Sequence, residues 1–353
     1  MQTHLIFYYD EQKTIYLTPY DAWHSNKPCA FYYHDNVFEK ANWKVEPTQT
    51  LDQLYAERAQ KIRDEYEYVI VCYSGGNDSS NILETFYYNN IHIDEIVMVG
   101  SFSQDVYDKT VDENHNSDLY LNAFPLLKTL NLPNTKITTI DYTEIFRDIK
   151  QFSLIQKYDT DWIKYIGTHK SPHNLFWHDF RKFVGRNNTK KTAWIMGNEK
   201  AEVTFSSKYT GSSAFVSFRD GPINSYGMRY HDENFTRVNF YCDPDPAAIN
   251  IQIKQAHIFN KIWNLASSEQ RWKMRSPYLR VSAQNKLFYN PKNPLIYQSE
   301  KSTSSFLSVR DKFLLKTQNS DIVNYYVTTL NCHNEYAKLE GGRGYNSKPY
   351  FIT

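Results

Sequence analysis

The expected fold rests on one stretch, Val71-Cys72-Tyr73-Ser74-Gly75-Gly76-Asn77-Asp78-Ser79-Ser80. It follows an apolar run, residues 68–71, that is typical of a buried strand, and it precedes a helical pattern at residues 81–86. Two glycines let the backbone approach an anion closely, and a helix N-terminus offers N–H groups and a favourable dipole. The order of strand, glycine-rich turn and helix therefore predicts a phosphate-binding turn. The alternative is an ordinary Gly-Gly turn in which Asp78 serves only as a helix N-cap.

The segment Ser74-Gly75-Gly76-Asn77-Asp78-Ser79 resembles the Ser-Gly-Gly-x-Asp-Ser signature of the PP-loop ATP pyrophosphatases, also called N-type ATP pyrophosphatases. Members of this superfamily, among them asparagine synthetase, split ATP between its α and β phosphates. They adenylate a carboxylate or amide oxygen, release pyrophosphate, and let a nucleophile displace AMP. The resemblance implies a fold of the adenine nucleotide α-hydrolase-like (HUP) type, with ATP and Mg²⁺ as ligands. The residues it assigns to nucleotide binding are Ser74, Gly75, Gly76, Asn77, Asp78, Ser79 and Ser80.

Alternating patterns after residue 49 predict an α/β fold built on a doubly wound parallel sheet. Strands are expected at 67–73, 94–99, 136–140 and 192–196. Helices are expected at 50–65 with Thr50 as N-cap, at 79–89, at 116–131 with a kink at Pro125, and from Tyr142 onward. Residues 150–190 have an irregular helical pattern.

Short aromatic and β-branched runs flank this core. They predict antiparallel strands at 4–9, 14–18 and 29–38, and further strands at 214–218 and 237–241. A turn at 243–246 leads into an expected helix at 247–265. We therefore divide the chain into an N-terminal β element (1–48), a PP-loop core (49–200), and a mixed α/β region (201–353) that completes the core and the acceptor site.

A second polar loop, Gly197-Asn198-Glu199-Lys200, follows the expected strand 192–196. Ligands of open α/β sheets bind at the carboxyl ends of strands, where the first loop also lies. A carboxylate among phosphates requires a divalent cation, so Asp78 is predicted to bind Mg²⁺. Glu199 resembles the acidic residue that completes the magnesium site in asparagine synthetase-like members, and Lys200 would place a cation near the α-phosphate. The alternative is a surface Glu-Lys turn.

The end of the expected strand 94–99 leads into Gly100-Ser101-Phe102. In the superfamily this strand end meets the adenosine, so Gly100 and Ser101 are candidate nucleotide-binding residues. An ordinary strand-to-helix loop is equally compatible with the pattern.

Three other groups of residues are weaker candidates. Lys254 and His257 share a helix face and, with the nearby Asp243 and Asp245, could line an acceptor pocket, although a solvated helix face is the commoner case. The clustered histidines and the glycine-rich stretch near the end lack a metalloprotease or nucleotide-loop pattern, so we interpret them as structural and as a flexible tail. These residues are His169, His173 and His178, and the range 341–348.

Composition restricts the partners and the compartment. The chain has 40 basic and 39 acidic residues, so its net charge favours neither nucleic acid nor an acidic membrane, although a local basic patch stays open. Its four cysteines are scattered without a Cys-x-x-Cys pair, and no apolar run is as long as a membrane span. These features favour a cytoplasmic protein. The abundance of Tyr, Asn, Lys and Ile suggests AT-rich coding DNA, as in a phage whose protein would work in the host cytoplasm.

Departures from the family narrow the expected reaction. Gln2 stands where amidotransferases carry a nucleophilic cysteine, and about 66 residues before the first core strand are too few for a glutaminase domain. The leading hypothesis is an enzyme that adenylates a carboxylate or carbonyl for attack by an amine or ammonia, with Asp78 and Lys200 as its catalytic residues. Ammonia or sulfur would have to come from a separate donor. The alternatives are a sulfur transferase acting on a nucleotide or tRNA through Cys242, and an inactive nucleotide-binding module.

Overall fold

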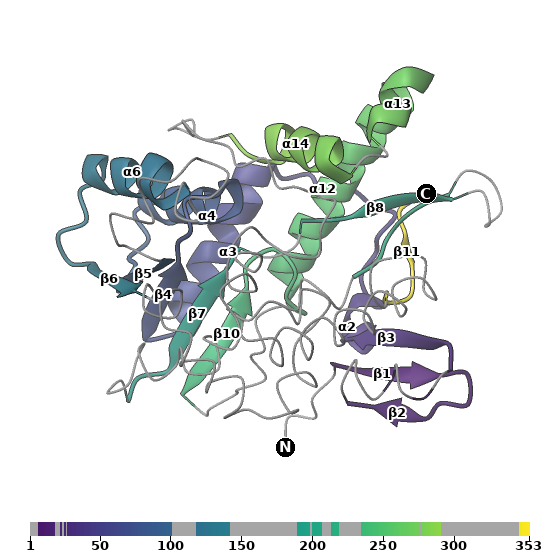
Figure 1. Cartoon of the computed structure of the whole chain (residues 1–353), viewed down its shortest axis with the longest axis horizontal. Coiled ribbons are helices and arrows are strands. Elements are labelled where there is room, and N and C mark those ends of the chain that lie inside the picture. Colours follow the sequence, from purple (N-terminus) through teal and green to yellow (C-terminus); the bar gives the residue numbers. More distant parts are fainter. Residues whose placement is uncertain are drawn as a thin grey trace, which may run out of the picture.

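A five-stranded parallel sheet lies at the centre of the fold, which confirms the predicted α/β class (Figure 1). The computed structural model describes residues 6–17, 22, 25, 27–100, 118–141, 189–197, 200–206, 213–218, 234–274, 277–290 and 346–353. The strand order is β10-β7-β4-β5-β6. The strands are β4 (Tyr68–Cys72), β5 (Glu95–Gly100), β6 (Lys136–Asp141), β7 (Thr192–Met196) and β10 (Phe235–Asn239).

The three central strands β4, β5 and β7 are buried along most of their length, which explains their predominantly apolar sequences. The edge strand β6 is largely exposed and more polar. Alternate side chains of β4 point to opposite faces: Val69 and Val71 join the main core, whereas Ile70 joins a second cluster. That second cluster contains Ile70, Val97, Ile140, Trp194, Met196 and Phe235.

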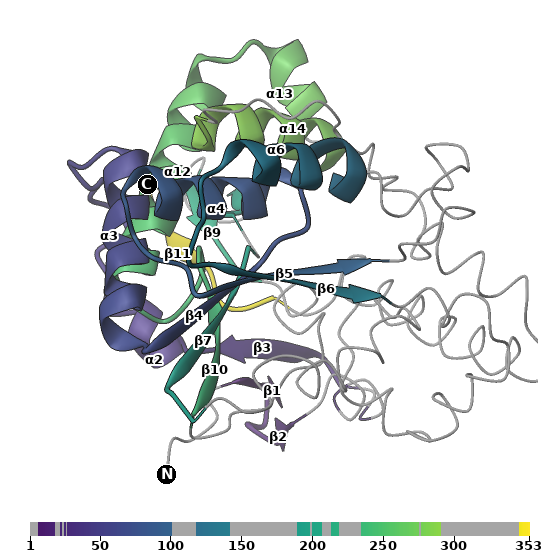
Figure 2. The same ribbon diagram turned by 90° about the vertical axis from the view of Figure 1, so that its left-hand side faces the viewer.

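Helices α3 (Leu51–Glu65) and α4 (Asn77–Tyr88) pack against each other and against β4. Thr50 is the N-cap of α3, as predicted, and forms a capping box: its hydroxyl accepts from the Gln53 N–H, and the Gln53 side chain accepts from the Thr50 N–H. Figure 2 shows α4 and α6 (Phe124–Thr129) on the same side of the sheet.

The expected helix at 116–131 is divided in two. A π-helical turn, η1 (Leu119–Ala123), precedes α6, and Pro125 lies in the first turn of α6. Proline cannot donate a backbone hydrogen bond, so it belongs in a first helical turn rather than in a helix interior. The predicted interruption at Pro125 is therefore a new helix start that follows a π turn.

The predicted N-terminal antiparallel strands form a sheet of order β2-β1-β3, which lies at the lower right of Figure 1. Its strands are β1 (Ile6–Asp10), β2 (Ile15–Tyr16) and β3 (Cys29–Tyr33). The expected extension of the third strand to residue 38 is wrong, because Asp35–Phe38 form the short helix α2. His34 adopts a left-handed conformation (φ 49°), which ends the strand and turns the chain.

The mixed region contributes to the parallel sheet and also forms elements of its own. The predicted strand at 237–241 is β10, which pairs with β7 in parallel, and the strand predicted at 214–218 is β9. A second antiparallel sheet has the order β11-β9-β8, and β8 was not predicted. Its strands are β8 (Val203–Ser206), β9 (Ser213–Val216) and β11 (Tyr350–Phe351).

Three helices follow β10: α12 (Pro246–Leu265), α13 (Ser268–Met274) and α14 (Pro277–Phe288). The predicted turn at 243–246 starts α12, where the Asp245 carboxylate caps the helix by accepting from the Ala247 N–H. Helix α12 packs against α3 and α14. None of the helices in the described ranges is long and apolar enough to cross a membrane. The helix expected from Tyr142 and the irregular segment up to residue 188 lie outside those ranges, and with them the candidate residues His169, His173 and His178.

Candidate functional site

The strand order changes direction between β4 and β7. From β4 the chain proceeds outward through β5 to β6, and it then returns to place β7 on the other side of β4. In open α/β sheets such a reversal leaves a crevice at the carboxyl ends of the two strands, where ligands bind. The glycine-rich loop follows β4, and the segment leading to Lys200 follows β7, so the two predicted loops leave the sheet at neighbouring positions.

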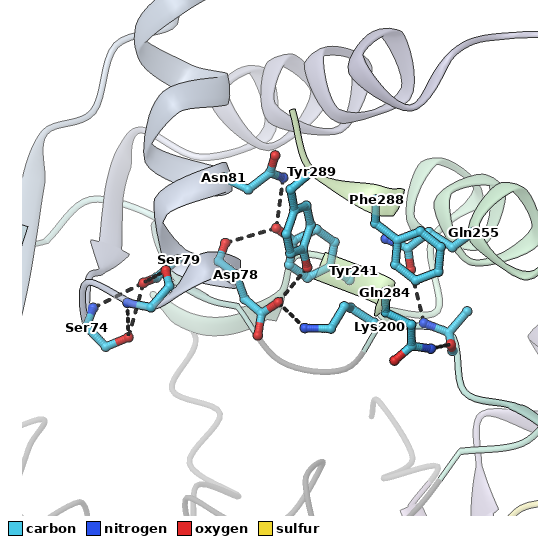
Figure 3. A network of polar contacts seen from close by, with 12 residues as sticks. Ser74, Asp78, Ser79, Asn81, Lys200, Tyr241, Gln255, Gln284, Phe288 and Tyr289 are labelled. Atoms are coloured by element: carbon cyan, nitrogen blue, oxygen red, sulfur yellow. Dashed lines mark hydrogen bonds and ion pairs between the residues drawn. The ribbon is translucent and has the colours of Figure 1, made fainter. Parts of the chain in front are cut away.

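The glycine-rich loop is held in shape by its own serines (Figure 3). The Ser74 N–H donates to Ser79 Oγ (3.2 Å), the two hydroxyls contact each other (3.1 Å), and Ser79 Oγ also donates to the Gly76 carbonyl (3.2 Å). The loop therefore closes onto the first turn of α4, whose amides are not used by intrahelical hydrogen bonds. Gly76 is the N-cap of α4, so Asp78 is not the cap and its side chain serves another purpose.

Gly75 is the position where this loop needs glycine. Its φ is +80°, and a Cβ there would lie only 2.2 Å from the carbonyl oxygen of Asp118. The neighbouring Asn122 side chain, in the π turn η1, donates to the Gly75 carbonyl at 3.2 Å. The turn is thus packed directly against η1, and any larger residue would force the two apart.

Asp78 and Lys200 form an ion pair that connects the two loops (Figure 3). The Lys200 ammonium contacts Asp78 Oδ1, and its side chain is only 10% exposed, compared with 31% for Asp78. Gly197 allows this approach, because a Cβ there would lie 3.2 Å from both the Asp78 Cβ and the Ser79 nitrogen. The structure therefore brings together two residues that the sequence singled out separately.

Two buried tyrosines complete the surroundings of Asp78. The Tyr289 hydroxyl donates to Asp78 Oδ1 (2.5 Å), and the Tyr241 hydroxyl donates to the Asp78 main-chain carbonyl (2.9 Å) while accepting from Asn81 (2.9 Å). Burial, followed by the Asp78 charge, raises the pKa of Tyr289 well above its ordinary value, and burial does the same for the pKa of Tyr241. Both hydroxyls therefore stay protonated and remain donors at physiological pH.

The other predicted site residues are partly placed. Ser80 is buried in α4, with its hydroxyl 3.4 Å from that of Tyr73, and Asn77 begins the helix. Gly100 ends β5, at the same edge of the sheet as the glycine-rich loop. Ser101 and Glu199 lie outside the described residues.

A divalent cation would find one carboxylate at the described part of this site. No cluster of three metal-ligating side chains occurs among the described residues. Mg²⁺ commonly takes only one or two protein carboxylates and fills its remaining positions with phosphate oxygens and water. The partly exposed Asp78 carboxylate, next to a loop suited to phosphate, fits that mode of binding.

The residues of the suggested acceptor pocket do not converge. Lys254 donates to the Pro47 carbonyl (3.0 Å) and His257 contacts the Trp43 carbonyl (3.0 Å), so both hold the loop before α3. Asp243 and Asp245 instead pair with Arg58. These contacts are structural ones. Cys242 is fully buried, which gives no support to a role as a sulfur carrier.

Sequence reasoning missed the buried part of the site. Tyr241 and Tyr289 had no motif that distinguished them in a chain with 29 tyrosines, and nothing singled out Gln284. Gln255 lies between the candidates Lys254 and His257 but was given no role. Their importance becomes visible only when α12 and α14 are placed next to the glycine-rich loop.

Comparisons of the sequence with known protein families and with curated proteins found no match.

Proposed function

We propose that this protein is an ATP-dependent adenylating enzyme that converts ATP to AMP and pyrophosphate. In this reaction it activates a carboxylate or carbonyl for attack by an amine or ammonia, in the manner of asparagine synthetase. The observation that supports the proposal most is the Asp78–Lys200 ion pair beside the glycine-rich loop. It places a carboxylate and an ammonium group from two different loops at the carboxyl ends of adjacent parallel strands.

The chemistry follows from these positions. The first-turn amides of α4 and the hydroxyls of Ser74 and Ser79 would bind the β and γ phosphates. Asp78 would hold Mg²⁺, which supplies positive charge to the phosphate oxygens when bound. Lys200 would stabilise negative charge as the bond between the α and β phosphates breaks. Catalysis of this kind depends on positioning and charge rather than on a covalent enzyme intermediate.

The proposal is tested by following labelled ATP. The chain is incubated with α- and γ-labelled ATP, Mg²⁺, ammonia and a panel of carboxylates and carbonyl compounds, and the products are separated. We expect AMP and pyrophosphate with at least one acceptor. Products consisting of ADP and phosphate would contradict the proposal. Tight ATP binding without any cleavage between the α and β phosphates would identify a nucleotide-binding module instead.

The role of Asp78 has its own test. Asp78→Asn keeps the shape of the side chain but removes its charge, so we expect AMP formation to fall by at least about a hundredfold. Asp64→Asn is the matched control, because Asp64 is an exposed carboxylate on α3 that contacts only Gln60 among the described hydrogen bonds. Equal activities of the two variants would remove Asp78 from the site.

A further inference from the structure

The residue after Lys200 is held by two side chains rather than by a neighbouring strand. Ala201 is fully buried, its N–H donates to Gln255 Oε1 (3.0 Å), and its carbonyl accepts from Gln284 Nε2 (2.9 Å). Figure 3 shows both amides reaching this segment from α12 and α14. Strand β8 begins only at Val203, so Ala201 lies before the sheet hydrogen bonds start.

Both glutamines are themselves buried and fixed. Gln255 is 0% exposed and Gln284 is 4% exposed. The Gln255 amide donates to the Tyr55 hydroxyl (3.0 Å), and that hydroxyl donates to the Phe288 carbonyl (3.0 Å). A buried amide that loses its partner costs free energy, so these contacts hold Gln255 in one arrangement, and the hydrogen bond to the Ala201 carbonyl does the same for Gln284.

Residues at the C-terminal end of α14 contact the surroundings of both Lys200 and Asp78. Gln284, on α14, fixes the residue next to Lys200, and Tyr289, just beyond α14, donates to Asp78. The Lys200 ammonium also lies 5.4 Å from the centre of the Tyr289 ring. Residues at the C-terminal end of α14 therefore fix both the backbone next to Lys200 and the orientation of the Asp78 carboxylate.

We infer that Gln255 and Gln284 form an amide clamp on Ala201 and are positioning residues for Lys200. The clamp holds the backbone from which the Lys200 side chain leaves, so that its ammonium group reaches the end of the glycine-rich loop. The consequence for catalysis rests on the proposed function, whereas the mechanical role of the clamp does not.

The clamp is tested by the reactivity of Lys200 in the full-length chain. The wild type, Gln284→Met and Gln255→Met are treated with an amine-acylating reagent, and the labelling of each lysine is followed by mass spectrometry. Methionine keeps the approximate size but removes the hydrogen bonds. We expect the labelling rate of Lys200 to rise about tenfold, the change that the loss of one buried hydrogen bond produces in an opening equilibrium.

Two internal standards make the result decisive. Lys254 is also part-buried and paired, with Glu46. Because it precedes Gln255 on α12, it serves as the standard for Gln284→Met only, in which its labelling rate should not change. Gln60→Met replaces an exposed glutamine and should leave Lys200 as in the wild type. The inference is overturned if Lys200 stays protected in both clamp variants, or if Lys200 and Lys254 become reactive together in Gln284→Met.

If the variants fail to fold, hydrogen exchange in the wild type tests whether the clamp holds Ala201. The Ala201 amide should exchange slowly because its partner is a buried side chain, and rapid exchange would overturn the inference.

Enzyme kinetics provide a separate test of the consequence for catalysis. Gln284→Met should lower kcat for AMP formation more than it raises KM for ATP. If the wild type forms no AMP, the proposed function fails while the labelling result still decides the clamp.

Discussion

The two sides of the candidate site are built in opposite ways. The loop wall, residues 74–80, is shaped by hydrogen bonds between its own serines and backbone, together with the packing of Gly75 against η1. The assembled wall consists of residues from distant segments, and Tyr289 lies 211 positions from the Asp78 that it contacts. The residues of the assembled wall are Lys200, Tyr241, Gln255, Gln284 and Tyr289. A short stretch of sequence is therefore enough to predict the loop wall, whereas the assembled wall forms only when α12 and α14 pack next to the loop.

The largest loss of stability is expected for Gly75→Ala, a substitution in the loop wall. The new Cβ meets the Asp118 carbonyl and requires a left-handed backbone, and together the overpacking and the backbone strain should cost about 3 kcal/mol of unfolding free energy. Urea unfolding followed by circular dichroism measures this loss.

Gly76→Ala is the matched control for this substitution. Gly76 has an extended backbone, and a Cβ there would have no neighbour closer than the Ser74 hydroxyl at 3.5 Å. We expect a loss of about 1 kcal/mol or less, of the size seen for exchanges at a helix N-cap. Equal losses in the two variants would show that the loop does not depend on the backbone of Gly75.

The assembled wall should respond to alkaline pH. The pKa of Tyr289 is raised in the folded state by burial and by Asp78, so the unfolded chain loses this proton first, near pH 10. The stabilising contribution is complete below pH 10 and falls by about 1.4 kcal/mol per pH unit above it, until the folded-state pKa is reached. Tyr289→Phe should reduce the slope of unfolding free energy against pH by that amount. An unchanged slope would mean that Tyr289 ionises equally in both states.

The smallest effect should come from the hydroxyls of the loop wall. Ser79→Ala removes the acceptor of the Ser74 N–H and the donor to the Gly76 carbonyl, so we expect a loss of about 1 kcal/mol in urea unfolding. Ser80→Ala should cost less, because the Ser80 hydroxyl is 3.4 Å from its partner on Tyr73. If Ser80→Ala proves the more damaging change, the loop is held by its packing on β4 rather than by its own serines.

Local signals explain what could be predicted from the sequence. Thr50, the apolar run before Cys72 and the glycine pair act over a few residues, so α3, the central strand and the loop were all expected. At Asp35 local signals gave the wrong prediction, a strand where the structure has a helix. The aromatic run before it favours a strand, but the left-handed turn at His34 and the hydrogen bond from Tyr350 to the Asp35 carboxylate belong to the folded chain alone.

The candidate site divides in the same way. Asp78 was found because it is the carboxylate of the glycine-rich motif, and Lys200 because it follows a strand expected to end at the same edge of the sheet. Gln284 could not be found, because its only signal is a buried amide opposite a main-chain carbonyl that the sequence does not place.

The position of β4 in the sheet has a consequence for the nascent chain. One neighbour of β4, strand β5, leaves the ribosome soon after it, but the other neighbour, β7, is synthesised only after β6 and the long segment that follows β6. Until then one edge of β4 has no partner strand. Unpaired N–H and C=O groups on such an edge can form hydrogen bonds with strands of other chains, which leads to aggregation. Recombinant production should therefore gain from weak induction, which keeps the concentration of unfinished chains low and makes contact between two unpaired edges rarer.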